Sequence, residues 1–341
     1  MYKVMSLIIV LLTSLPTSGT AFTVGDPARI HMVVWRGCES ACEGFRRFFY
    51  DRDLPVKITV TNVGKDKSKL IKIRETLIAE KPDLVVTWGT SVSVGIIGTI
   101  KEFGSNTALG DIPVLFMIVA DPVRSNIVES YTSSGRDFVT GVRNRVPEKT
   151  QIGLILQYFK PKKIGVINSP NEDNSKINTA RLKEIAAQEE FEVVSLEYNV
   201  GLDGKPKKEE IPELMQQLRN EGAEAVYVGS SSFNLENRDL FSASAIMQRL
   251  PLFSAYAQMV QESGALMAVA NAYVNVGKLA AGQAKRILFD RANPIDLPIV
   301  SLSRFSVFIN ANTAKQLELY PPIQLINIAK FVFGTEAVKY K

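Results

Sequence analysis

Short apolar runs alternate with amphipathic stretches along most of the chain. The first run, residues 30–35, is apolar at almost every position, which is typical of a strand buried on both faces of a parallel sheet. The next stretch, residues 39–50, places Ala41, Phe45, Phe48 and Phe49 on one helical face. The pattern therefore predicts a buried strand followed by a helix, and this pair recurs.

The same alternation runs through two successive rounds. In the first we expect strands at 56–60, 84–88, 112–120 and 138–142, and helices at 67–80 and 91–103. In the second we expect strands at 163–168, 191–198, 225–229, 252–256, 265–270 and 299–309, and helices at 148–158, 174–189, 208–220, 235–248, 276–290 and 311–319. Strands joined by helices form parallel sheets covered on both faces. We therefore predict an α/β fold of two doubly wound lobes, each with three α/β/α layers.

The connection between the two rounds is short. Residues 143–146, Arg-Asn-Arg-Val, lead directly to Pro147, with no Gly/Ser-rich or Pro-rich linker. We expect the chain to cross back later. The N-terminal lobe is then residues 27–143 plus about 257–297, and the C-terminal lobe is 144–256 plus about 298–341. Lobes joined by several short hinge crossovers open and close about each other.

The first 21 residues have the three zones of a secretory signal peptide. Lys3 supplies the positive start, residues 4–15 are apolar, and Gly19 and Ala21 are the small side chains that signal peptidase requires. The apolar zone is shorter than the roughly 20 residues that cross a bilayer. We expect cleavage near Ala21 and a mature protein that is exported to the periplasm, soluble and monomeric.

Two cysteines in an exported chain raise the question of a disulfide. In a regular helix, the Cβ atoms of Cys38 and Cys42 would lie about 5–6 Å apart, whereas a disulfide needs about 3.8 Å. Either the helix begins irregularly and the two are bridged, or they are free thiols. The spacing does not fit a metal or redox-catalytic site.

Composition excludes several classes of function. His31 is the only histidine, so histidine-based catalysis and histidine-rich metal sites are disfavoured. The net charge of +5 is spread over 341 residues and does not resemble a nucleic-acid-binding stripe. The sequence lacks phosphate-loop, dinucleotide-binding and nucleophile-elbow motifs. We expect neither a cofactor nor catalysis.

The candidate binding residues follow the predicted strands, because ligands of open parallel sheets bind beyond the carboxyl ends of the strands. They are polar or aromatic: Trp35, Arg36, Thr90, Ser91, Asp121, Asn168, Asn174, Ser231 and Tyr256. Arg36 is the cation best placed to meet a carboxylate. Several also have an ordinary structural explanation. Thr90, Ser91 and Asn174 can cap helices, Asp121 before Pro122 can begin a turn, and Trp35 can be core.

Three stretches resemble a known family. The first is Ala-Asp-Pro-Val-Arg-Ser-Asn-Ile-Val at 120–128, and the second is residues 161–168 with Asn-Ser at 174–175. The most specific is the third, with Gly-Ala-Leu at 264–266, Ala-Tyr at 272–273, Pro-Ile-Asp-Leu-Pro at 294–298 and Ile-Asn-Ala-Asn-Thr-Ala at 309–314. The sequence resembles the type I periplasmic solute-binding proteins of ABC importers, in the branch with tryptophan- and aromatic-amino-acid-binding members.

The resemblance implies that a small polar solute, an amino acid among the candidates, is captured between two lobes and delivered to a membrane permease with its ATPase. Ser91 and nearby N–H groups would hold a carboxylate, and Asp121 or another acid would meet an ammonium group. Two segments depart from the family: Trp-Arg-Gly-Cys at 35–38, and Ser-Ser-Ser-Phe at 230–233, where an acidic segment is common. An extracytoplasmic sensor coupled to a membrane receptor is the alternative function.

Overall fold

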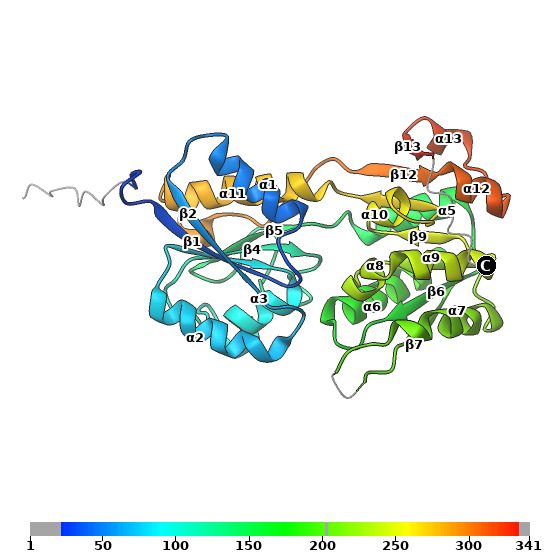
Figure 1. The fold of residues 1–341 in the computed structure, drawn as a ribbon, viewed down its shortest axis with the longest axis horizontal. Coiled ribbons are helices and arrows are strands. Elements are labelled where there is room, and N and C mark those ends of the chain that lie inside the picture. Colours follow the sequence, from blue (N-terminus) through cyan, green and yellow to red (C-terminus); the bar gives the residue numbers. More distant parts are fainter. Residues whose placement is uncertain (1–21, 202–203, 334–341) are drawn as a thin grey trace, which may run out of the picture.

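The computed structural model describes residues 22–201 and 204–333. The predicted signal peptide, residues 1–21, lies outside the described residues. The chain forms two lobes, each built around one sheet with helices on both faces (Figure 1). The predicted α/β class and the two-lobed architecture are confirmed. None of the helices within the described ranges is both long and apolar enough to cross a membrane.

The sheet of the N-terminal lobe is entirely parallel, in the order β11-β5-β4-β3-β1-β2. Its strands are β1 (Ala28–Val34), β2 (Val56–Asn62), β3 (Leu84–Trp88), β4 (Val114–Val119), β5 (Val139–Arg143) and β11 (Val300–Ser301). Helices α1 (Ser40–Tyr50) and α11 (Tyr273–Leu288) cover one face. The other carries α2 (Leu70–Glu80) with its leading turn Lys67–Lys69, and α3 (Thr90–Ile97). The short helix α4 (Ile100–Phe103) follows α3.

The sheet of the C-terminal lobe has the order β13-β12-β10-β9-β8-β6-β7, and β12 runs antiparallel to β10. Its strands are β6 (Lys163–Asn168), β7 (Glu192–Glu197), β8 (Ala225–Val228), β9 (Leu252–Ser254), β10 (Met267–Ala270), β12 (Ser306–Asn310) and β13 (Ala329–Val332). Its longer helices are α5 (Glu148–Tyr158), α6 (Asp173–Glu189), α7 (Ile211–Asn220) and α9 (Arg238–Met247). The shorter ones are α8 (Ser232–Glu236), α10 (Gln258–Gln261), α12 (Ala311–Leu317) and α13 (Ile323–Ile326).

Strand β8 shows why the central strands read as continuous apolar runs. Ala225 and Tyr227 pack into the core under α5 and α6, whereas Val226 and Val228 pack into the core under α7 and α9. Successive side chains of a strand point to opposite faces, and here both faces are covered by helices.

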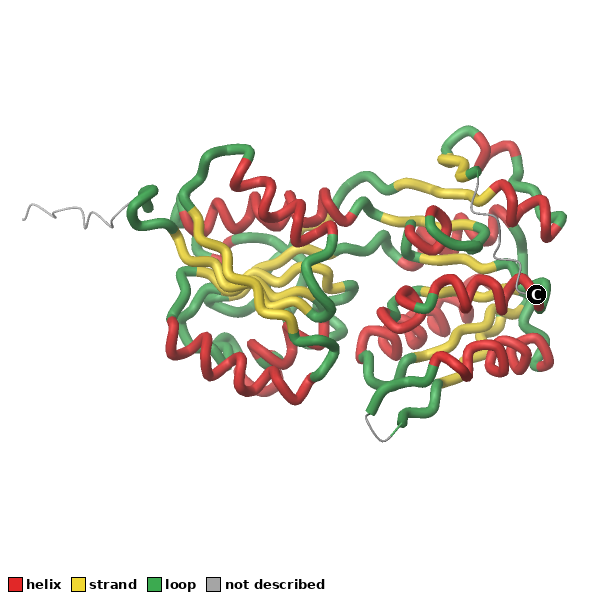
Figure 2. Tube along the Cα trace, viewed as in Figure 1, coloured by secondary structure: helices red, strands yellow, loops and turns green. Residues whose placement is uncertain are grey.

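Within the described residues the chain crosses between the lobes three times, at 144–147, 271–272 and 302–305 (Figure 2). The first crossing agrees with the predicted hinge. The other two differ from the expected boundaries near 257 and 297. Strand β10 pairs with β9 and stays in the C-terminal lobe, and β11 pairs with β5 in the N-terminal lobe. The periodicity of a buried strand shows that it is buried, but not which sheet it joins.

Some predicted elements are divided in the structure, and the helix expected at 235–248 is one of them, because α8 ends at Glu236 and α9 begins at Arg238. The helix expected at 91–103 is broken into α3 and α4 at Gly98, which has φ +69°. The extended stretch expected at 299–309 contributes β11 to one sheet and β12 to the other. In each case a local break separates segments that the apolar pattern joins.

Helices α1 and α11 pack with their backbones almost in contact. A Cβ atom at Gly277 would lie 1.8 Å from the carbonyl oxygen of Ala41, and one at Gly44 would lie 2.1 Å from that of Val274. Only glycine permits this approach. The contact fixes the first turn of α1, and with it the segment that follows β1, against the helix that begins at the second crossing.

Candidate functional site

A cavity lies between the carboxyl ends of the two sheets, and both lobes line it. Its walls come from the residues after β1, β3, β4 and β5 in one lobe and after β8 and β9 in the other, together with the starts of α6 and α11. The space between the walls, including the mouth, is about 440 Å³.

Six of the predicted binding residues line this cavity: Trp35, Arg36, Thr90, Ser91, Asn174 and Tyr256. Thr90 and Ser91 are the first residues of α3, and Asn174 lies in the first turn of α6. These side chains come from both lobes because each follows a strand whose carboxyl end faces the opposite lobe. Their contact with a ligand stays a prediction.

The other three predicted residues are not among the lining residues. The Asp121 carboxylate lies 3.0 Å from the Tyr131 hydroxyl and 3.1 Å from the Arg124 backbone nitrogen, both donors to it, beside an adjacent hollow. Asn168 accepts hydrogen bonds from Ser175 and Thr179 in α6. Ser231 is the N-cap of α8. In all three residues these hydrogen bonds give the side chain a structural role within its own lobe.

The sequence analysis missed several lining residues, among them Trp88, Asn144 and Tyr273. Asn144 lies in the first crossing and Tyr273 directly follows the second. A hinge forms the base of the cleft that it closes. The polar residues of the predicted crossover could therefore have been predicted to line the cavity. Asn144 and Tyr273 also touch each other: the Asn144 Nδ2 donates to the Tyr273 hydroxyl at 2.9 Å.

Arg36, which the sequence analysis gave as the cation best placed to meet a carboxylate, is already paired with the carboxylate of Glu39. Its guanidinium stacks on the Trp88 ring, with Cζ 4.9 Å from the ring centroid. Its Nε and Nη2 donate to both oxygens of Glu39, at 2.7 and 3.0 Å. Burial lowers the pKa of Arg36, but the Glu39 carboxylate more than offsets this and the net pKa is raised. The charge of Arg36 is therefore already paired, and its Nη1 donates across the cleft to the Ser232 hydroxyl.

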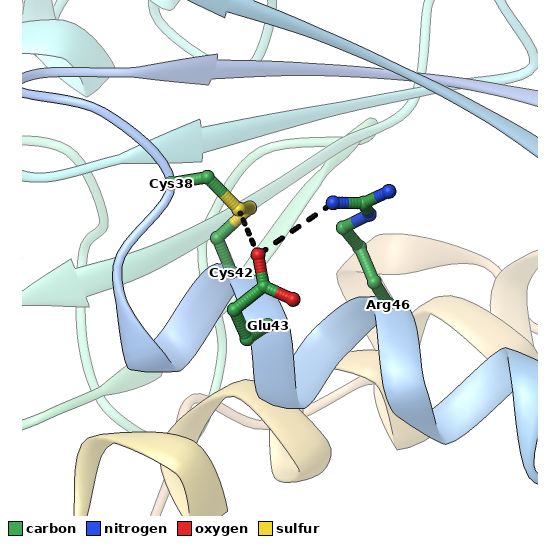
Figure 3. The surroundings of a disulfide bond; sticks show 4 residues. All are labelled: Cys38, Cys42, Glu43 and Arg46. Carbon is green, nitrogen blue, oxygen red and sulfur yellow. Dashed lines mark hydrogen bonds and ion pairs between the residues drawn. A yellow bond between two sulfur atoms is a disulfide. The ribbon is translucent and has the colours of Figure 1, made fainter.

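A disulfide between Cys38 and Cys42 fixes the segment that carries Arg36 (Figure 3). The helix begins only at Ser40, after the extended N-cap Glu39, so Cys38 precedes the first turn and the Cα atoms of the two cysteines are 5.1 Å apart. This is the irregular helix start that a bridge requires. The Glu43 carboxylate contacts the Cys38 sulfur at 3.2 Å and pairs with Arg46.

Several hydrogen-bond donors at the cavity have no acceptor. Helix α3 has no side-chain cap, and the first N–H groups of a helix have no partner within it. The Nε1 of Trp88 is buried and has no partner among the described residues. Behind Ser230, the buried Arg145 donates through Nη2 to Ser230 and to the Gly229 carbonyl, whereas its Nη1 has no acceptor in the described chain. Such a donor set suits a carboxylate.

Glu172 is a buried carboxylate beneath the cavity wall. It is 3 % exposed, and its oxygens accept the N–H groups of Ser232 and Phe233 at 2.6 and 3.1 Å. Burial raises the pKa of Glu172 to about 6, although these N–H groups and Arg36 act in the opposite direction. Burial likewise raises the pKa of Tyr256 and of Tyr273, so both hydroxyls stay neutral at physiological pH.

Ion pairs join the two lobes around the rim of the cleft: Lys65 with Glu236, Lys67 with Asp173, and Arg124 with Glu184. In each pair the cation belongs to the N-terminal lobe and the anion to the C-terminal lobe. The described residues hold no group of three or more histidine, cysteine, aspartate or glutamate side chains that could bind a metal.

Comparison with known proteins adds a family and a fold. Residues 37–332 match the family model described as ABC transporter substrate binding protein. A tyrosine-binding protein from Clostridioides difficile (strain R20291) is 25% identical over 286 residues, which are 82% of this chain and 77% of that protein.

The solved structures that resemble this chain share its two-lobed fold. A domain in complex with L-Trp from Streptococcus pneumonia has a TM-score of 0.74 at 24% identity, and a conserved domain protein from Vibrio cholerae has 0.76 at 19%. Each alignment covers 89% of this chain and 99% of the other. A periplasmic ribose ABC transporter protein from Conexibacter woesei has a TM-score of 0.56 at 13% identity, over 88% and 97% of the two chains. These likenesses confirm the predicted type I periplasmic-binding-protein fold.

Proposed function

Because the chain belongs to the family of ABC transporter substrate-binding proteins, we propose that it captures one small solute in the cavity between its lobes and releases it unchanged. The observation that carries this proposal is the lining itself. Both lobes contribute side chains, the walls combine tryptophan and tyrosine rings with hydroxyl and amide groups, and the buried Nε1 of the lining residue Trp88 has no partner among the described residues. Such a site binds a small molecule with a flat apolar body and a polar end.

We infer a ligand that carries a carboxylate next to an aromatic body. The donors at the start of α3 and on Trp88 suit the carboxylate, and Trp35, Tyr256 and Tyr273 offer aromatic surface for the body. The names of two similar proteins, a tyrosine-binding protein and a domain in complex with L-Trp, point to the same chemical class. Amino acids with aromatic side chains and their close derivatives are therefore the ligands to test first.

The exported protein would deliver its ligand to a membrane permease that works with an ATPase, as expected for this family. Export rests on the predicted signal peptide at 1–21, with cleavage near Ala21 and a soluble, monomeric mature protein in the periplasm. In this proposal the chain performs no chemistry, and its work is binding, closure and release.

Intrinsic fluorescence tests the proposal, since both tryptophans of the chain line the cavity. The protein from residue 22 onward is titrated with amino acids, aromatic carboxylic acids, sugars and other small solutes, and each change in fluorescence is checked by calorimetry. We expect at least one solute to bind, with an increase in unfolding free energy of about 2.7 kcal/mol when present at 100 times its Kd.

A variant pair localises the binding. Asn174→Ala removes a lining amide and should weaken binding about tenfold, whereas Asn220→Ala, at the end of α7 and outside the lining, should leave binding unchanged. If no solute binds, or if one is chemically converted, the proposal is wrong. Equal losses in the two variants would place the ligand elsewhere.

A further inference from the structure

We propose that Arg145 positions the Ser230 hydroxyl as a hydrogen-bond donor to the ligand carboxylate and supplies the buried positive charge that favours an anion at that point. The inference rests on the proposed function and concerns the same cavity. It adds a positioning residue that is not itself among the lining residues, and it states which property of the ligand the C-terminal wall of the cavity recognises.

Arg145 is a buried cation that forms no ion pair with a carboxylate of the described chain. It belongs to the first crossing between the lobes and is 5 % exposed. Its Nη2 donates to two neutral oxygens, the Gly229 carbonyl at 2.6 Å and the Ser230 hydroxyl, and its Nη1 has no acceptor among the described residues. The Glu148 carboxylate acts on Arg145 from a distance and accepts a hydrogen bond from Asn178 instead. Because buried charges are normally paired, this one favours an anion that enters beside it.

The other arginine at the cavity is already compensated. Both oxygens of Glu39 accept hydrogen bonds from Arg36, which leaves that pair electrically neutral. The second carboxylate near Arg36 is that of Glu172, whose oxygens accept two backbone N–H groups of the C-terminal lobe. The buried positive charge that remains for a ligand is therefore that of Arg145.

Arginine side chains also fix the hydroxyl groups of two lining serines as donors. Ser230 accepts from Arg145, and Ser232 accepts from Arg36 across the cleft. An arginine can only donate, so the serine oxygen is the acceptor at each contact and its own proton is left for a further acceptor. Neither hydroxyl has such an acceptor in the described part of the chain. Ser231 between them differs, because it caps α8 and lies outside the lining.

The two serines lie opposite the donors of the N-terminal lobe. The Arg36 guanidinium that donates to Ser232 also stacks on the Trp88 ring, so one side chain contacts both walls. A carboxylate has two oxygens and can accept from both walls at once, from Trp88 and the start of α3 on one side and from the serines on the other. Binding of this group therefore links the lobes, with the charge of Arg145 behind the Ser230 hydroxyl.

Pairs of ligands that differ in charge at this one group test the proposal on the wild-type protein. Tryptophan, tyrosine and phenylalanine are each compared by calorimetry with their own primary amide, which keeps the aromatic body, the ammonium group and one carbonyl oxygen. For the amino acid that binds most tightly, we expect an affinity about tenfold or more above that of its amide. Equal affinity for the acid and the amide would overturn the inference.

Variants of Arg145 separate positioning of the carboxylate from support of the hinge. Arg145→Gln removes the charge and should lower the ratio of the two affinities about tenfold, whereas Arg145→Lys keeps the charge and should retain most of the ratio. Ser230→Ala should also lower the ratio, and should add little to Arg145→Gln, because both residues act on the same carboxylate. Arg219→Gln makes the same change at an exposed arginine of α7, outside the lining, and should leave the ratio unchanged.

An equal loss of affinity for the acid and the amide in folded Arg145→Gln would mean that Arg145 only supports the hinge, and would overturn the inference. The inference is also wrong if the chain binds none of these six compounds and captures another solute, although solute capture then stands. If Arg145→Gln does not fold, the wild-type ratio and Ser230→Ala decide. If the wider screen finds no bound solute at all, the proposed function itself fails.

Discussion

The buried carboxylate of Glu172 should make the stability of the protein fall as the pH rises. Its pKa is about 6 in the folded chain against an ordinary value of 4.5, because burial disfavours the charged form. The folded state thus holds this proton more tightly than the unfolded state. The stabilisation is complete below pH 4.5 and is lost as the pH rises through 6. The difference between these pKa values corresponds to about 2 kcal/mol of unfolding free energy.

The variant Glu172→Gln isolates this contribution, because its side chain is neutral at every pH. Urea unfolding followed by far-ultraviolet circular dichroism, at intervals from pH 4 to pH 7.5, gives the unfolding free energy of both proteins. Titration of all other groups cancels in the difference. We expect the variant to gain about 2 kcal/mol relative to wild type across this range, whatever its constant offset from altered hydrogen bonds to Ser232 and Phe233.

A difference between the two proteins that stays flat with pH, or that changes in favour of the wild type, would refute the reasoning. The first result would mean that water or a structural change solvates Glu172. The second would mean that the pairing with Arg36 outweighs burial.

Further predictions concern packing, the disulfide and closure. Gly277→Ala should lower the unfolding free energy by about 1–3 kcal/mol, since its Cβ would meet the backbone of α1. Gly282→Ala on the same helix adds a Cβ that meets no other atom, and should be neutral or slightly stabilising. Thermal unfolding of the two variants compares these effects. Replacing Cys38 and Cys42 by serine should cost about 2 kcal/mol in urea unfolding, and an unchanged midpoint would argue against the bridge. Raising the salt concentration from about 0.05 to 0.5 M should weaken ligand binding a few-fold in calorimetry, because salt screens the ion pairs at the rim of the cleft. An affinity that does not depend on salt would show that these ion pairs do not hold the lobes closed.

The rule that ligands bind beyond the carboxyl ends of parallel strands predicts some lining residues of the cleft correctly and others wrongly. Ligand-facing residues follow parallel strands, so Trp35, Thr90, Ser91 and Tyr256 could be placed near one another from the apolar pattern. Ser231 satisfies the same rule and instead caps α8, because a side chain one position along the turn points into the helix start rather than into the cavity. The rule locates the edge of the sheet, and only the turn geometry decides which side chains face the ligand.

The pattern of apolar positions by itself determined the alternating elements, the two α/β lobes, the first hinge at 144–147 and the edge of each sheet where a ligand would bind. All of these depend on local periodicity and on the right-handed connection of parallel strands. Tertiary structure alone decided that β10 stays in the C-terminal lobe, that Glu39 neutralises Arg36, and that Asn144 and Tyr273 meet at the base of the cleft. These outcomes depend on contacts between segments far apart in the chain, and a periodic pattern carries no information about such partners.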